Sequence, residues 1–326
     1  MFKKTWKHLK ILLILIILLI CLPHSILPHK INEGDDLETY KKQNEKEMRL
    51  IEYKDSEDAL KLKIYQLDNI NKSRKKNNAP PVKLDILASR VANKMAKEAA
   101  ENEFLGHWNL AGEEPYLRYA FAGGYDHVSE NAFGQWSSDN YTVSNQAIAS
   151  MMKAGHESFM SERAPADGHK ANIIEKSHNY AGIGYFIKGK QFRYYEEFID
   201  RYFEFENIPS EVKTGDKFNI TVKTNGNNYL YYMIIYKQKF PRALSPAEIN
   251  KRGGYMDYTN DQYKEITAWD LSRYRNGTVY TIPLSFSDEG LYYIHIYADK
   301  KEITKPGTLN TKGKTPATGI VIKATR

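Results

Sequence analysis

Residues 182–196 read GIGYFIKGKQFRYYE, and this stretch decides how the first half of the chain folds. Large apolar residues alternate with other residues on both sides of Lys188-Gly189-Lys190, with Ile183 and Tyr185 before the turn and Phe192 after it. An alternation with period two is typical of β-strands, and a short glycine-containing turn between two such runs is typical of a hairpin. The stretch therefore predicts a β-hairpin.

Three helices are predicted upstream of this hairpin. The first ends before a pair of prolines, and its apolar residues recur at intervals of three and four. They are Leu60, Ile64, Leu67 and Ile70. Asp85 can cap a second helix, whose apolar stripe runs up to Asn102. A third helix covers about residues 143–159. Residues 59–205 are therefore interpreted as one domain that mixes helices and sheet.

The residue pattern of the chain changes after Asn207-Ile208-Pro209. Runs rich in β-branched and aromatic residues follow, separated by turns that contain Gly, Asp and Pro. They cover residues 218–222, 229–236, 278–284, 291–297 and 319–323. Ser245-Pro246-Ala247-Glu248 is a capping box that predicts one short helix among the strands. Residues 206–326 are therefore predicted to form an all-β, Ig-like sandwich, so that the fold class of the chain is α+β.

The composition excludes several classes of protein. The chain has 326 residues, enough for two domains, and its hydrophobic fraction of 41% is that of a globular protein. The net charge is +7, and four lysines lie within residues 1–10, so we expect no nucleic-acid partner. The single cysteine, Cys21, precedes both predicted domains. The domains therefore contain neither a disulfide nor a thiolate metal ligand.

The N-terminus predicts export. A basic opening precedes residues 11–22, which are twelve unbroken apolar residues. This length matches the core of a signal peptide and falls short of the roughly 20 residues of a spanning helix. No clear cleavage site follows, so membrane anchoring through residues 11–28 is the alternative. Residues 1–28 are interpreted as a signal peptide or an anchor, and residues 29–58 as a charged, solvated tether that is partly helical. The remainder is expected outside the cell or at its surface.

Five motifs follow one another in order through the first domain. They are Ile70-Asn71-x-x-Arg74, Phe104-x-x-His107, residues 112–118, Gly124-Tyr125 leading to Ser129-Glu130-Asn131, and Gly168-His169-Lys170-Ala171-Asn172-Ile173-Ile174 leading to Gly182-Ile183-Gly184. In this order they resemble the CAP superfamily, which comprises cysteine-rich secretory proteins, antigen 5, plant pathogenesis-related proteins and secreted bacterial members. The resemblance covers about 145 residues. It implies an α-β-α sandwich with a central cleft.

The resemblance also implies that two histidines and two acids line this cleft. The matching positions are His107, Glu130 and His169. The fourth position departs from the family, because the helix before the second histidine lacks the tryptophan found there in animal and plant members. Glu157 is the nearest acid in that helix and is carried over as the candidate. The disulfides of the family are absent as well.

Three interpretations of these side chains stay open at the level of sequence. Two imidazoles and a carboxylate are competent ligands for a divalent metal such as Zn²⁺. The same groups can act as general acid and base. They can also form a hydrogen-bonded network that ties loops together. His107, Glu130 and His169 are far apart in the sequence, so their spacing does not decide between these interpretations.

Two classes of function are compatible with these features. The first is an extracellular binding module whose partner is an extracellular ligand, a cell-wall component or another protein. The second is a metal-assisted extracellular hydrolase that acts on peptides or cell-wall components. The sequence has no compact metal-binding helix motif and no serine in a nucleophile elbow. We therefore favour the binding module over the enzyme.

Overall fold

A computed structural model describes residues 37–141, 143–255 and 261–326. The predicted signal peptide or anchor lies outside these residues, as does the first part of the predicted tether. Within the described ranges no helix combines the length and apolar character needed to cross a membrane. All of the described residues belong to a single compact unit.

The first domain is organised around a four-stranded sheet with the strand order β1-β3-β4-β2. Its strands are β1 (Lys83–Leu84), β2 (His127–Trp136), β3 (Tyr180–Lys188) and β4 (Gln191–Asp200). The predicted hairpin is β3 and β4, which pair in antiparallel fashion, and Gly189 in the turn has a φ of 55°. This left-handed conformation favours glycine, because glycine has no Cβ to clash. The hairpin prediction is confirmed.

Helix α4 (Ile86–Glu101) packs closely on one face of this sheet. The Asp85 side chain caps it by accepting from the Ala88 N–H at 2.6 Å, as predicted. A Cβ added to Gly184 would lie 2.2 Å from the carbonyl carbon of Ala92, and one added to Gly182 would be nearly as close to Ala88. The two glycines of β3 therefore allow the helix backbone to approach the sheet.

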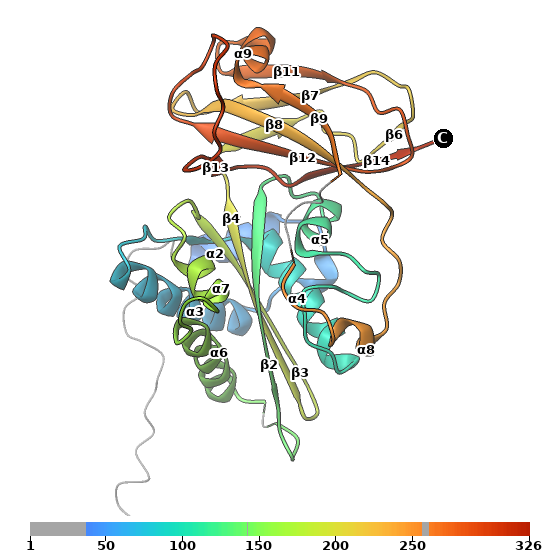
Figure 1. The fold of residues 1–326 in the computed structure, drawn as a ribbon. Helices are drawn as coiled ribbons and strands as arrows, with labels where there is room; N and C mark the ends of the chain where they lie inside the picture. The colour runs from blue at the N-terminus through green and yellow to red at the C-terminus, as the bar shows by residue number, and fades with distance from the viewer. Residues whose placement is uncertain (1–36, 142, 256–260) are drawn as a thin grey trace, which may run out of the picture. The chain divides into compact units, whose positions relative to one another are not determined.

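The other face of the sheet is covered by α3 (Glu57–Lys76), α6 (Asn145–Met160) and α7 (Gly168–Ile174), while α5 (Pro115–Phe121) lies on the side of α4 (Figure 1). The apolar stripe of α3 is buried as predicted, with Leu60, Ile64, Leu67 and Ile70 all at most 4% exposed. The result is the α-β-α sandwich that the family resemblance implies.

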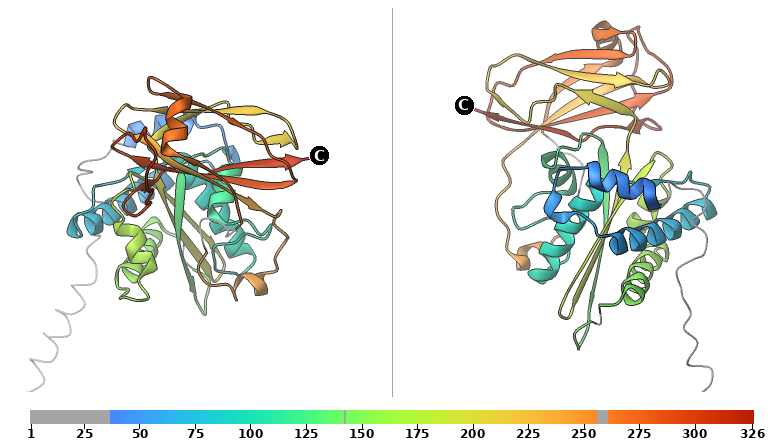
Figure 2. Two further views of the ribbon diagram at one scale, coloured as in Figure 1. Left: turned by 45° about the horizontal axis from the view of Figure 1, so that its top comes forward. Right: turned by 180° about the vertical axis from the view of Figure 1, so that it is seen from behind.

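Residues 37–58 are partly helical, as predicted, but they pack on the first domain instead of forming a solvated tether. They form α2 (Leu37–Lys46) and a 3₁₀ turn, and α2 contacts α3 and α4 (Figure 2). The Tyr40 side chain is buried, and its hydroxyl accepts from the Leu84 N–H at 3.1 Å. The guanidinium of Arg90 donates to the carbonyl oxygens of Asn44, Glu47 and Arg49. The charged composition concealed this docking, because main-chain carbonyls rather than apolar side chains carry most of it.

The second domain is a sandwich of two sheets that follows the predicted strands. One sheet has the order β10-β11-β7-β5, and the other has the order β6-β14-β12-β8-β9 with β13 beside β12. The strands are β5 (Phe203–Glu206), β6 (Glu211–Lys213), β7 (Phe218–Thr224), β8 (Tyr229–Gln238), β9 (Gln262–Thr267), β10 (Arg275–Asn276), β11 (Val279–Leu284), β12 (Gly290–Asp299), β13 (Thr315–Pro316) and β14 (Ile320–Thr325). The predicted short helix is α8 (Pro246–Ile249), which has its capping box. Side chains such as Ile220, Ile235 and Ile294 fill the core between the sheets.

The outer face of the β12 sheet packs against the first domain. Tyr293 of β12 stacks on Tyr116 of α5, with ring centroids 4.8 Å apart. Leu291 and Val321 belong to the same buried cluster as Leu87 of α4. The predicted division at residues 205 and 206 falls within β5, which pairs with β7 of the sandwich. The two halves of the chain therefore share a hydrophobic core as well as a boundary.

Candidate functional site

The candidate site is built around the free edge of β2. This strand lies at the end of its sheet and pairs with β4. Consecutive side chains of a strand point to opposite faces, so Glu130 and Asn131 reach the two sides of the sheet. Glu130 contacts His107, and Asn131 donates to the carbonyl oxygen of His169 at 3.1 Å. The edge strand thus brings together two histidines from different layers.

His107 lies between α4 and α5, and Glu130 orients its ring. The Nδ1 of His107 is 2.8 Å from Oε1 of Glu130. Because a carboxylate only accepts, Nδ1 carries the hydrogen and Nε2 is left as the acceptor of the neutral ring. Arg118 of α5 donates to the other oxygen of Glu130 and to the carbonyl oxygen of His107. Both oxygens of Glu130 are therefore engaged inside the protein.

A second buried acid lies behind this pair. Glu197 of β4 is directly across from Glu130 in the strand register and is 1% exposed. Burial raises the pKa of Glu197 well above its usual value, and the charge of Glu130 raises it further. Burial also opposes the charge of Glu130, but Arg118 and His107 hold the pKa of Glu130 below its usual value. The surroundings therefore favour the charged form of Glu130 and the neutral form of Glu197.

His169 lies in α7, and Glu162 orients its ring. The Oε1 of Glu162 is 2.5 Å from Nδ1 of His169, and its Oε2 accepts from the backbone N–H groups of His169 and Lys170. Phe159 of α6 stacks on the imidazole, with ring centroids 4.7 Å apart. Glu162 therefore has the same relation to His169 as Glu130 has to His107, and it also satisfies the first amides of a short helix.

Amide side chains fasten α7 to β2. Asn172 of α7 donates to Oδ1 of Asn131 at 3.0 Å and accepts from the hydroxyl of Ser129 at 2.6 Å. His178 also contacts Asn172 Oδ1, at 3.0 Å. The position of His169 is therefore fixed through both its side chain and the helix that carries it.

The two histidines face one cavity of about 600 Å³. Their ring centroids are 6.5 Å apart. The cavity is lined by His107, Ser129, Glu130, Asn131, Glu162, Ala166, Gly168, His169, Asn172, Gly254 and Tyr255. A cleft of this size with a few convergent polar groups is typical of a small-ligand site.

The structure brings three of the four predicted residues together and corrects the fourth. His107, Glu130 and His169 all line the cavity. Glu157 does not, because its side chain is 64% exposed on α6, where it pairs with Lys153. Glu162, in the loop between α6 and α7, is the second acid that lines the cavity. One sequence feature could have pointed to Glu162: it is an acid that shortly precedes the N-terminus of α7, where the helix dipole favours negative charge.

The side chains of the cleft limit which atoms can serve as metal ligands. Among the residues that the structure describes, no group of three or more His, Cys, Asp and Glu side chains is arranged to hold a metal ion. Glu130 is engaged by Arg118 and His107, so it orients an imidazole rather than offering its own oxygens. Carboxylates hold Nδ1 of both rings, so a metal bound in this cleft would have to use the Nε2 atoms of His107 and His169. Two imidazole nitrogens with carboxylates behind them match the surroundings of metal-ligating histidines.

The model of the cysteine-rich secretory protein family, CAP, matches residues 67–199. This part of the chain is a CAP domain. The match contains His107, Glu130 and His169, and it also covers Glu162. A comparison with curated proteins gave no match.

Solved structures are similar to parts of the chain. One is an extracellular protein from Bacillus anthracis that contains an SCP domain, with 19% identity, a TM-score of 0.32, and coverage of 42% of this chain and 39% of that one. The chain thus spans well under two thirds of that protein. Another is an outer surface protein of Borrelia burgdorferi, with 18% identity, a TM-score of 0.32, and coverage of 41% and 89%. A superoxide reductase from Ignicoccus hospitalis has 14% identity and a TM-score of 0.21, with coverage of 38% and 81%.

Proposed function

We propose that the chain is an extracellular CAP-domain binding protein whose cleft binds a divalent cation through His107 and His169. The observation that carries the proposal is the pairing of each imidazole with a carboxylate through Nδ1, at 2.8 Å from Glu130 and 2.5 Å from Glu162. Such a partner fixes the tautomer and the ring, and it makes Nε2 a better ligand.

Zinc is the cation that these donors fit best. Imidazole nitrogen is a common zinc ligand, whereas structural zinc sites close their shell with four protein ligands and often with thiolates. Two imidazoles alone predict micromolar rather than structural affinity. When bound, zinc would offer its remaining positions to water or to an oxygen of a second ligand.

The location outside the cytoplasm is part of the same proposal. It is supported by the basic opening and the twelve apolar residues at 11–22. Secretion signals combine these two features.

Binding is a better account of the cleft than hydrolysis. Ser129 lines the cavity, but its hydroxyl donates to Asn172 rather than to an imidazole. Neither histidine therefore activates Ser129 as a nucleophile, which supports a binding role over hydrolysis by a serine.

Calorimetry with zinc chloride on the full chain tests the proposal. We expect the wild type to bind one zinc ion and the double variant His107→Ala with His169→Ala to bind none. Zinc should also raise the melting temperature of the wild type and leave that of the double variant unchanged, because a ligand of the native state stabilises it.

The same experiment distinguishes a site from a structural network. In a network, His169→Ala lowers the melting temperature by the same amount with and without zinc, because it leaves polar partners unpaired. Unchanged zinc uptake in the double variant would reject the proposed site.

A further inference from the structure

One segment of the second domain returns to the CAP domain. It covers residues 242–255, lies between β8 and β9 and contains α8. Leu244 donates to the carbonyl oxygen of Leu110 at 2.9 Å, and the Leu105 N–H donates to Oδ1 of Asn250 at 2.9 Å. Ile249 is fully buried in a cluster with Phe104. We call residues 242–255 the returning segment.

Gly112 shows how closely the returning segment approaches. A Cβ added to Gly112 would lie 2.1 Å from the carbonyl oxygen of Arg242, and the φ of this glycine is 82°. Both the contact and the backbone conformation require glycine here. The start of the returning segment is therefore fitted to the loop that follows His107.

The other end of the returning segment lies in the cleft. The hydroxyl of Tyr255 accepts from the backbone N–H of Glu130 at 2.6 Å, on the free edge of β2. The ring centroids of Tyr255 and His107 are 4.8 Å apart, and Tyr255 lines the same cavity. The His107 side chain is 12% exposed, whereas that of His169 is 34% exposed. Tyr255 thus lies against the imidazole that is less accessible.

We propose that the cleft is a composite site in which the second domain supplies Tyr255 as a positioning residue for His107. The consequence for cation binding rests on the function proposed above. Glu130 holds Nδ1 of the imidazole and Tyr255 packs against its ring, so that the direction of Nε2 is set from two sides. The affinity of the cleft for a divalent cation therefore depends on a residue outside the CAP domain.

A labelling experiment tests this arrangement without any metal. Diethyl pyrocarbonate modifies neutral imidazole nitrogen, and peptide mass spectrometry separates His107 from His169 within one molecule. In the full chain, Tyr255→Ala should raise the labelling rate of His107 severalfold and leave that of His169 unchanged. Tyr255→Phe keeps the ring and should behave like the wild type. Phe240→Ala removes an exposed aromatic residue that precedes the returning segment, and it serves as the matched control.

The zinc affinity of the same variants completes the test. Tyr255→Ala should weaken zinc binding roughly tenfold, as loss of a residue that supports a metal ligand does, and Tyr255→Phe should restore it. An unchanged His107 labelling rate in Tyr255→Ala would overturn the composite site, as would an equal rise at His107 and His169. If the wild type binds no zinc while Tyr255→Ala still exposes His107 alone, the proposed function fails and the composite cleft stands.

Discussion

At the scale of single residues, the cleft depends on which acid stands behind each histidine. Glu162 contacts the His169 imidazole and two backbone amides of α7, whereas Glu157 extends from α6 toward Lys153. Both are glutamates in the same part of the chain, so they form a matched pair for substitution.

Glu162→Gln should weaken zinc binding, and Glu157→Gln should not. Glu162→Gln removes the charge that supports Nδ1 of His169, and loss of such a partner lowers metal affinity by roughly 10- to 100-fold. Calorimetry on the two variants measures the difference. Equal affinities would contradict the role assigned to Glu162.

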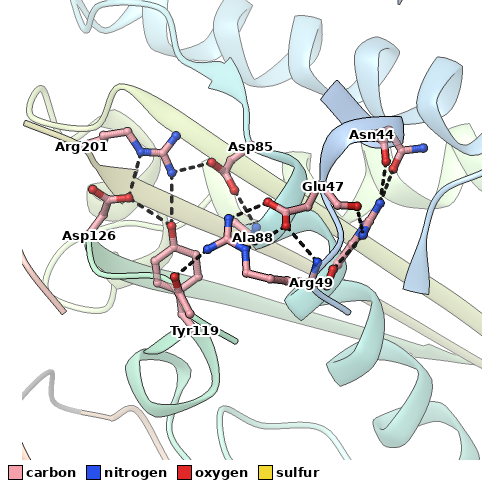
Figure 3. A network of polar contacts seen from close by, with 10 residues as sticks. Asn44, Glu47, Arg49, Asp85, Ala88, Tyr119, Asp126 and Arg201 are labelled. Atoms are coloured by element: carbon pink, nitrogen blue, oxygen red, sulfur yellow. Dashed lines mark hydrogen bonds and ion pairs between the residues drawn. The ribbon is translucent and has the colours of Figure 1, made fainter. Parts of the chain in front are cut away.

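Asp126 gives a second prediction at this scale. Its carboxylate accepts from Nε of Arg201 at 2.9 Å and from the hydroxyl of Tyr119 at 3.2 Å (Figure 3). Burial raises the pKa of Asp126 to about 6, against the opposing effect of Arg201, from an ordinary value of 3.8. Between these two values the folded state binds more protons than the unfolded state, so the contribution of this group to stability falls as the pH rises.

Asp126→Asn should therefore flatten the pH dependence of stability. From about pH 4.5 to about pH 6.5, the contribution of Asp126 to the free energy of unfolding should fall by about 2 kcal/mol. Urea unfolding at the two pH values measures this change in the wild type and the variant. Identical pH dependence in both proteins would show that Asp126 does not titrate in this range.

At the scale of elements, the close packing of α4 on β3 supports the loop that carries His107. Gly184→Ala would place a methyl group against the backbone of Ala92. Overpacking of this kind costs about 1–3 kcal/mol. Gly307→Ala is the control, because a Cβ there would meet no atom within 4 Å. Urea unfolding should show a lower free energy of unfolding for Gly184→Ala and an unchanged one for Gly307→Ala. Equal stability of the two variants would contradict the importance of this close packing.

Most elements could be predicted from the sequence because their signals are local. The period of the apolar residues in α3, the capping by Asp85 before α4 and the alternation around Gly189 each specify an element without tertiary information. The docking of α2 was missed, because it relies on the buried Tyr40 and on carbonyls that bind Arg90. Main-chain acceptors leave no pattern in a sequence.

The site was predictable only where a motif marks it. His107, Glu130 and His169 lie in motifs that resemble a known family, whereas Glu162 lies in a loop outside those motifs. Tyr255 comes from a different domain and has no local signal at all. Its contact with Glu130 joins residues 125 positions apart.

At the scale of the whole molecule, the shared core predicts cooperative unfolding. Tyr116, Leu87 and Val128 of the first domain lie in one buried cluster with Tyr293 and Val321 of the second. Unfolding of either domain would expose this cluster in the other, and burial of each large apolar side chain contributes about 1.5–3 kcal/mol to stability. The unfolding of the two domains is therefore coupled.

Differential scanning calorimetry of the full chain should therefore show a single transition. Tyr293→Ala should destabilise the domains unequally and separate the transition into two. Two well-separated transitions in the wild type would show that the domains fold independently.

Two imidazoles, held by Glu130 and Glu162, form the proposed cation site. X-ray absorption at the zinc edge of the zinc-loaded full chain tests this site most directly. We predict two imidazole nitrogens at about 2.0–2.1 Å, with oxygen atoms completing the shell. A shell of oxygen alone, or one that contains sulfur, would contradict binding through His107 and His169.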